Sequence, residues 1–163
     1  MTLDRRSMLM GTALVAALGS RYGAPPARAA AGGFRVARTD EGWRRLLDPT
    51  AFDVLRRDGT ERPFSSPLNR EHRPGRFACA GCGAALFSSA TKFDSHTGWP
   101  SFWRPLEGAV GESRDGTLGT ARTEIHCATC GGHLGHVFSD GPPPTGLRYC
   151  MNGAALRFAP GAA

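Results

Sequence analysis

The chain has 163 residues, a formal net charge of +6 and 40% hydrophobic residues, which fits one globular domain rather than a large multidomain enzyme. No apolar stretch reaches the roughly 20 residues that a membrane-spanning helix needs. Gly and Pro are abundant, at 22 and 12 residues, a composition that favours turns and short strands over a helical bundle.

The first 29 residues have the features of a secretory signal peptide. Arg5-Arg6 precedes an apolar stretch from Met8 to Leu18, and Ala27-Arg28-Ala29 offers the small residues of a cleavage site. The paired arginines resemble the twin-arginine export signal, which carries folded proteins. We therefore expect a signal peptide at 1–29, a linker at 30–38, and an exported mature protein in the periplasm.

Cleavage after the signal would halve the net charge. Removing Arg5, Arg6, Arg21 and Arg28 together with Asp4 lowers the formal charge from +6 to +3. Basic residues do not cluster with aromatic ones in the remaining chain, so a nucleic-acid partner is not expected.

The mature domain, expected at 39–160, opens with two short helices. Thr39-Asp40-Glu41 has the cap and the acidic first turn of a helix that Pro49 ends, and a second helix is expected from about Thr50 to Arg57. Further along, short apolar segments alternate with Gly, Ser, Asp and Pro, which predicts small antiparallel sheets. These segments are Ala84–Phe87, Ala121–His126, His136–Phe138 and Ala155–Phe158.

Four of the five cysteines form two C-x-x-C pairs, each followed by glycine. They are Cys79, Cys82, Cys127 and Cys130. Two such turns supply the four soft ligands that tetrahedral zinc prefers. Disulfides are an alternative in an exported protein, and a thioredoxin-like redox pair is another, although no βαβ pattern surrounds either pair. Zinc is the favoured interpretation.

The fifth cysteine, Cys150, is either a buried inert thiol or a reactive one. In a strand, Arg148 and Asn152 lie on the same face as Cys150, and a nearby cation lowers a thiol pKa. His133 and His136 follow the second cysteine pair and are extra metal ligands, a structural pair, or proton donors to a nucleophile.

Aromatic residues bracketed by Gly and Pro form a further cluster around Trp99. The stretch Gly98-Trp99-Pro100-Ser101-Phe102 can line a small apolar pocket or pack in the core. Together with both cysteine pairs, with Gly-Gly-His-Leu-Gly-His-Val-Phe and with Arg-Tyr-Cys-x-Asn, this stretch resembles the B-type methionine-R-sulfoxide reductases. The similarity extends from about Asp40 to Phe158 and includes Thr60–Phe64.

The resemblance implies a mainly β fold, with two small antiparallel sheets around a zinc-stapled core and short N-terminal helices. It implies structural zinc on Cys79, Cys82, Cys127 and Cys130. It also implies an enzyme that reduces methionine R-sulfoxide, in oxidised proteins or as the free amino acid, through a sulfenic acid on the nucleophile. The residues that match the family's site are Cys150 as nucleophile, His133, His136 and Asn152 around the sulfoxide oxygen, Arg148 favouring the thiolate, and Trp99 against the substrate's methyl group.

One position departs from the family pattern. Many members carry a resolving cysteine where this chain has Thr97. We therefore expect an external thiol reductant, such as a thioredoxin-like protein or a glutathione-type thiol. The remaining alternatives are a zinc-ribbon-like binding module without catalysis and a C-x-x-C thiol–disulfide oxidoreductase.

Overall fold

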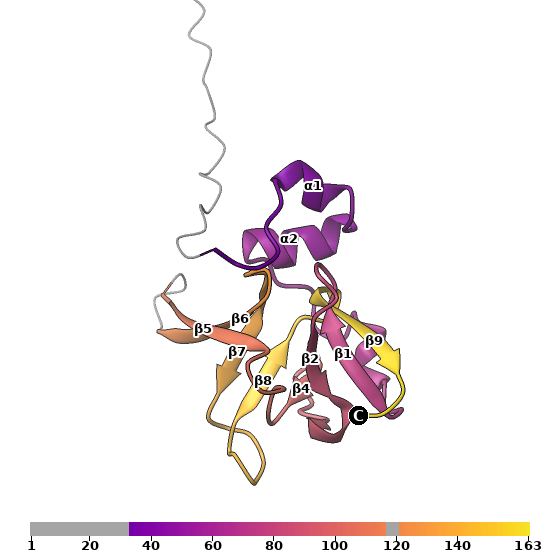
Figure 1. Cartoon of the computed structure of the whole chain (residues 1–163). Helices are drawn as coiled ribbons and strands as arrows, with labels where there is room; N and C mark the ends of the chain where they lie inside the picture. Colours follow the sequence, from indigo (N-terminus) through magenta and orange to yellow (C-terminus); the bar gives the residue numbers. More distant parts are fainter. Residues whose placement is uncertain (1–32, 117–120) are drawn as a thin grey trace, which may run out of the picture.

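The computed structural model describes residues 33–116 and 121–163. The expected signal peptide and the first three residues of the expected linker, 30–32, lie outside the described residues. Within these ranges, two helices at the N-terminal side cover one end of a pair of antiparallel sheets (Figure 1). None of the helices described is long and apolar enough to span a membrane.

Both helices begin where the sequence provides a cap. The α1 helix, Asp40–Arg44, starts at Thr39, whose hydroxyl accepts a hydrogen bond from the Gly42 amide. The α2 helix, Pro49–Arg57, is capped by the Asp48 carboxylate and ends at Asp58 in the left-handed conformation. Both expected helices are confirmed. The first ends earlier than expected, and Pro49 opens the second, because its fixed φ suits a first helical turn.

The strands form two sheets that are antiparallel at every pairing. The smaller sheet has the order β2-β1-β9, with β1 at Gly75–Cys79, β2 at Ala85–Ser88 and β9 at Leu156–Pro160. The larger sheet has the order β3-β4-β8-β7-β6-β5. Its strands are β3 Lys92–Phe93, β4 Ser101–Phe102, β5 Val110–Asp115, β6 Arg122–Cys127, β7 His133–Phe138 and β8 Arg148–Met151. The mainly β fold predicted from the sequence is confirmed.

Three single-turn 3-10 helices connect these elements. They are η1 at Pro67–Arg70, η2 at Ser89–Thr91 and η3 at Gly153–Ala155. The last of them joins β8 of the larger sheet directly to β9 of the smaller one, so the two sheets share a continuous piece of chain.

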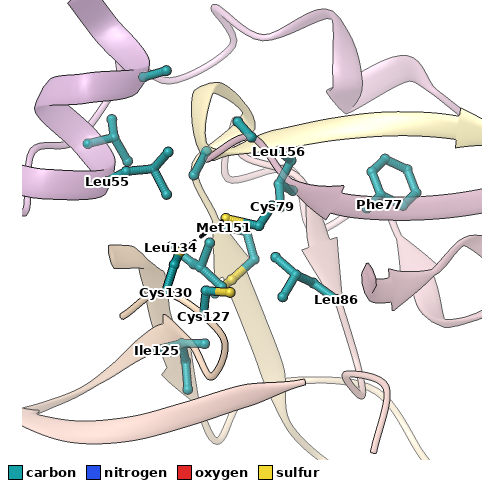
Figure 2. Packing of buried hydrophobic residues seen from close by; sticks show 14 of the residues in the cluster. Leu55, Phe77, Cys79, Leu86, Ile125, Cys127, Cys130, Leu134, Met151 and Leu156 are labelled. Carbon is teal, nitrogen blue, oxygen red and sulfur yellow. Dashed lines mark hydrogen bonds between the residues drawn. The ribbon is translucent and has the colours of Figure 1, made fainter. Parts of the chain in front are cut away.

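The hydrophobic core joins the two sheets. Phe77 of β1 and Phe102 of β4 are fully buried with ring centroids 4.9 Å apart, and Phe87 of β2 stacks on Phe102 at 4.4 Å. Leu55 of α2 and Leu134 of β7 belong to the same buried cluster as the cysteines (Figure 2). Each buried side chain of this size contributes about 1.5–3 kcal/mol. This packing fixes β7 and β8, which carry most of the predicted site, relative to the rest of the fold.

Candidate active site and metal centre

The two C-x-x-C pairs come together although they are far apart in the sequence. Cys79 and Cys82 lie at the turn from β1 to β2, and Cys127 and Cys130 at the turn from β6 to β7. Their sulfur atoms all lie within 4.8 Å of one another, with 3.7 Å between Cys79 and Cys130 and 3.6 Å between Cys82 and Cys127. Four sulfurs around one zinc ion would be about 3.8 Å apart. The cluster therefore fits one tetrahedral metal ion, and these sulfur pairs are too far apart for disulfides.

Glycines with positive φ close both cysteine turns. Gly83 has φ 76° and Gly131 has φ 65°, a region that favours residues without a Cβ. Their amides donate to the carbonyls of Cys79 and Cys127 at 2.9 and 2.8 Å. Each turn thereby brings its two thiols together, and Figure 2 shows the sulfur atoms gathered within the hydrophobic core.

Cys150 lies near the middle of a polar row that crosses five strands. On β8 it is directly opposite Ser101 of β4 on one side and His136 of β7 on the other. The row continues from His136 to Glu124 of β6, and from Glu124 to Ser113 of β5. Because directly opposite residues in antiparallel strands point to the same face, the thiol and the imidazole share one side of the sheet.

A pocket of about 220 Å³ opens beside Cys150. The predicted residues Cys150, His136, Asn152 and Trp99 all line it, and its other lining residues are Thr60, Arg122, Gly135 and Phe138. The indole Nε1 of Trp99 donates to the Glu61 carbonyl at 3.2 Å, which holds the ring at the pocket wall. The pocket thus combines a thiol, an imidazole and aromatic walls.

An acidic residue of β5 orients His136. The Nε2 atom lies 2.7 Å from the Asp115 carboxylate, which also pairs with Arg122 at 2.6 Å. An ionised carboxylate can only accept, so Nε2 carries a hydrogen and Nδ1 is the nitrogen that gains or loses a proton. Burial lowers the pKa of His136, and the hydrogen bond to Asp115 only partly opposes this effect.

His133 lies close to His136 but does not line the Cys150 pocket. Its Nδ1 is 2.9 Å from the buried Glu124 carboxylate, which also accepts a hydrogen bond from Ser113. His133 lines a neighbouring polar cavity of about 260 Å³ that His136 also lines. Its Nε2 is buried and has no hydrogen-bond partner among the described residues.

The amide of Asn152 connects the end of β8 to two other segments. Its Oδ1 accepts from the Glu61 amide at 3.0 Å, and its Nδ2 donates to the Leu134 carbonyl at 3.1 Å. The Glu61 carboxylate in turn accepts from the amides of Gly153 and Ala154 at 2.6 and 2.8 Å. Asn152 therefore braces the pocket wall, and one hydrogen of its Nδ2 remains for a ligand.

Arg148 lies near Cys150 but outside the pocket lining. Its guanidinium donates twice to the Asp140 carboxylate, at 2.9 and 2.8 Å, and covers the ring of Phe138 at 4.5 Å. Burial raises the pKa of Cys150, while a hydrogen bond from Thr97 and the charge of Arg148 lower it. Arg148 thus acts in the direction expected from the sequence, but burial outweighs it and the net pKa is raised.

Sequence reasoning missed the acidic residues that hold the histidines. Asp115 ends β5, and Glu124 lies in the middle of β6 beside Ile125. The one sequence signal for Glu124 is its position in the middle of an expected strand, because a carboxylate that is buried there needs a partner. Asp115 has no such signal, because its role depends on how β5 pairs with β6.

Comparisons with known proteins agree with this geometry. Residues 47–160 match the SelR domain family. The chain is 56% identical over 127 residues to a protein of Bradyrhizobium diazoefficiens named peptide methionine sulfoxide reductase MsrB, which covers 77% of this chain and 91% of that protein. Proteins of the same name match from Thiobacillus denitrificans, at 55% identity over 76% of this chain and 94% of that protein, and from Leptospira interrogans, at 51% over 77% and 96%.

Proposed function

The chain belongs to the SelR-domain family of peptide methionine sulfoxide reductases, and we propose that it reduces methionine R-sulfoxide with Cys150 as its nucleophile. The observation that carries this proposal is the pocket in which Cys150, His136 and Trp99 meet. A thiol beside an imidazole can attack an electrophile and receive proton help in the same step.

The reaction needs a proton on the sulfoxide oxygen and a thiolate on Cys150. His136 in its protonated form donates from Nδ1 to that oxygen, while Asp115 stabilises the imidazolium through Nε2. The sulfur of Cys150 attacks the sulfoxide, and the oxygen is transferred to it. Methionine leaves and Cys150 becomes a sulfenic acid, so the cysteine is oxidised by two electrons as the substrate is reduced by two.

Trp99 supplies the apolar side of the pocket. Its ring is fixed by the hydrogen bond to Glu61, and a substrate methyl group packed against it leaves the oxygen toward His136 and the free Nδ2 hydrogen of Asn152. Only one epimer can present its methyl group and its oxygen in this way, and membership of the family identifies it as the R form.

An external thiol completes the cycle. Thr97 stands where many relatives have a second cysteine, and the other four cysteines form their own cluster. One reductant thiol condenses with the sulfenic acid and releases water, and a second thiol then frees Cys150 as a disulfide of the reductant leaves. A thioredoxin-like protein or a glutathione-type thiol can perform both steps, and the substrates are oxidised proteins or free methionine sulfoxide.

The four clustered cysteines hold one structural zinc ion. The sulfur spacing and the soft donor set support this metal. With all four positions filled by protein ligands, the ion supplies no catalytic chemistry. It ties the β1–β2 turn to the β6–β7 turn.

Export is the remaining part of the proposal, and it rests on the sequence. Arg5-Arg6, the apolar stretch from Met8 to Leu18 and the small residues before Ala30 direct the chain to the periplasm by the twin-arginine route. N-terminal sequencing of the periplasmic protein should begin at Ala30. Arg5→Lys combined with Arg6→Lys should leave the uncleaved chain in the cytoplasm.

An epimer-resolved assay together with zinc analysis tests the activity. Wild-type protein should reduce the R epimer only, Cys150→Ser should abolish that activity, and both should bind one zinc. A Cys150→Ser variant that behaves like a wild type without reductase activity would indicate a binding module. C-x-x-C pairs that bind no zinc and exchange disulfides would indicate a thiol–disulfide oxidoreductase.

Trp99 has a matched control in the same loop region. Trp103 is half-buried beneath the Arg104 guanidinium and does not line the Cys150 pocket. Trp99→Ala should raise KM strongly, whereas Trp103→Ala should leave KM near the wild-type value.

A further inference from the structure

Three hydroxyl side chains form a continuous chain that ends at Cys150. The Oγ1 of Thr97 lies 3.9 Å from the sulfur of Cys150, and the Oγ of Ser95 lies 2.8 Å from that Oγ1. The Oγ of Ser101 follows at 2.7 Å from Ser95. At the far end, the Ser101 hydroxyl donates to the Trp99 carbonyl at 3.1 Å.

The local backbone holds this chain in place. His96 has φ 56°, a left-handed conformation, and its amide donates to the Asp94 carboxylate at 2.9 Å. This turn brings the hydroxyls of Ser95 and Thr97, on either side of His96, into contact. Ser101 is fully buried and lies directly opposite Cys150 in the sheet. The chain therefore has one end in β4, at Ser101, and the other end against Cys150 of β8, at Thr97.

The direction of the hydrogen bonds depends on the state of Cys150. A hydroxyl has one hydrogen to donate. When Cys150 is a thiol, its S–H donates to Thr97, Thr97 to Ser95, Ser95 to Ser101, and Ser101 to the Trp99 carbonyl. Every hydrogen then has an acceptor.

Loss of the Cys150 proton favours the opposite direction. A thiolate only accepts, so Thr97 must turn its hydrogen toward the sulfur. Ser95 then donates to Thr97. If Ser101 kept its bond to the Trp99 carbonyl, two oxygens 2.7 Å apart would face each other without a hydrogen between them. Ser101 therefore turns to Ser95, and all three hydroxyls point toward the negative charge.

We propose that Thr97, Ser95 and Ser101 form a reversible hydrogen-bond chain that satisfies Cys150 both as a thiol and as a thiolate. Thr97 contacts the reacting sulfur and is the catalytic residue of the three. Ser95 is a positioning residue that acts through Thr97, whereas Ser101 lies opposite Cys150 in the sheet and also lowers the thiol pKa through a hydrogen bond of its own. The catalytic role rests on the proposed function, whereas the coupling to the thiol does not.

The other polar groups around Cys150 are already paired with partners of their own, so the hydroxyl chain can contribute to the pKa of the thiol. The charged and titratable groups facing Cys150 are Arg148 of its own strand, His136 of β7 and Arg122 of β6. All three are paired with carboxylates: Arg148 with Asp140, and both Arg122 and His136 with Asp115. On the β4 side, the hydroxyl chain is the polar group that meets the sulfur.

The test measures how fast iodoacetamide alkylates Cys150 as a function of pH, with peptide mapping to count modification at this cysteine alone. Thr97→Val keeps the shape of the side chain but removes its hydroxyl. We expect the midpoint of its profile to rise by about half to one pH unit, which slows alkylation at neutral pH by about three- to tenfold. Thr97→Ser keeps the hydroxyl, so the midpoint of its alkylation profile should match that of wild type.

Ser95→Ala interrupts the chain one step away and should shift the midpoint in the same direction by a smaller amount. Thr145→Val removes a hydroxyl that bonds to the Trp103 carbonyl, outside the chain, and should leave the midpoint unchanged. An unchanged midpoint in Thr97→Val, or equal shifts in Thr97→Val and Thr97→Ser, would overturn the proposal. If Thr97→Val does not fold, an unchanged Ser95→Ala midpoint overturns it.

The measurement requires no sulfoxide substrate. A protein without reductase activity that still shows the predicted shifts would therefore contradict the proposed function and retain the hydroxyl chain. An active reductase without the shifts would support the proposed function and contradict the hydroxyl chain.

Discussion

Cys150 and His136 are directly paired residues of β8 and β7. Backbone pairing thus fixes the thiol and the imidazole on one face of the sheet, independently of any loop. His133, three residues earlier in the same strand, instead bonds to Glu124 and lies outside the pocket. The two histidines therefore have different surroundings and should respond differently to substitution.

Substitution of His136 should affect the reaction, and substitution of His133 should affect mainly stability. His136→Asn removes the proton donor and should lower kcat by about 10²–10⁴-fold. His133→Asn removes one buried hydrogen bond of Glu124, which keeps the one from Ser113, and should cost about 1–3 kcal/mol of unfolding free energy, with a smaller loss of kcat. Steady-state kinetics and urea unfolding of both variants check this, with exposed His72→Asn as the control. Equal losses of kcat in both variants would contradict it.

The pH profile should reveal the same proton donor. The pKa of His136 is lowered from 6.5 and that of Cys150 is raised from 9.0, in both cases chiefly by burial. In wild type, kcat/KM should therefore be flat between the lowered pKa of His136 and the raised pKa of Cys150. It should fall at lower pH, as Cys150 loses thiolate, and at higher pH, as His136 loses its proton. In His136→Asn the alkaline fall should disappear, so that activity rises with pH up to the pKa of Cys150. An alkaline fall that persists in this variant would assign the proton donor elsewhere.

The charge of Arg148 should be measurable at Cys150. Arg148→Met keeps most of the aliphatic chain and removes the guanidinium, so the pKa of Cys150 should rise further. Alkylation of Cys150 at neutral pH should slow by about threefold or more. Arg157→Met, an exposed change on β9, is the matched control. An unaltered alkylation profile in Arg148→Met would show that the Asp140 carboxylate already cancels the charge.

Metal loss should destabilise the fold before it affects the chemistry. Cys127 is fully buried in the cluster, and Cys127→Ser should release zinc and lower the melting temperature substantially, because metal binding contributes directly to folding. Cys150→Ser should keep one zinc and a near-wild-type melting temperature. Atomic absorption and thermal unfolding measure both quantities. A Cys127→Ser variant that binds no zinc but has the wild-type melting temperature would contradict a structural role for the zinc.

Gly153 and Ser66 should be coupled in stability. A Cβ at Gly153 would collide with the Ser66 side chain and approach Glu61 Oε1 at 3.2 Å. Gly153→Ala should therefore cost about 1–3 kcal/mol, and adding Ser66→Gly should recover part of that loss. Gly116→Ala, where a Cβ meets nothing within 4 Å, is the control. Urea unfolding of the four members of the cycle measures the coupling, and additive losses would contradict it.

The sequence predicted the features that depend on local pattern. Two C-x-x-C-Gly turns, two capped helices and short strands follow from spacing and turn chemistry, and the structure confirms them. Strand boundaries were less accurate. For example, β7 begins at His133 rather than at His136.

The environment of each histidine could not be derived from spacing. Residues three apart in a regular strand point to opposite faces. In β7, however, Leu134 is an extra residue opposite the step from Ile125 to His126, a bulge that brings the two imidazole rings to a centroid distance of 5.4 Å. The partners Asp115 and Glu124 come from neighbouring strands, so their roles depend on a register that the pattern leaves open.

The most direct test of the account is a single turnover with one equivalent of each methionine sulfoxide epimer in the absence of reductant, followed by mass spectrometry of Cys150. With the R epimer, we expect one equivalent of methionine and a sulfenic acid on Cys150 that dimedone traps. The S epimer should leave the thiol unchanged. A disulfide between Cys150 and a cysteine of the cluster, or oxidation by the S epimer, would contradict the account.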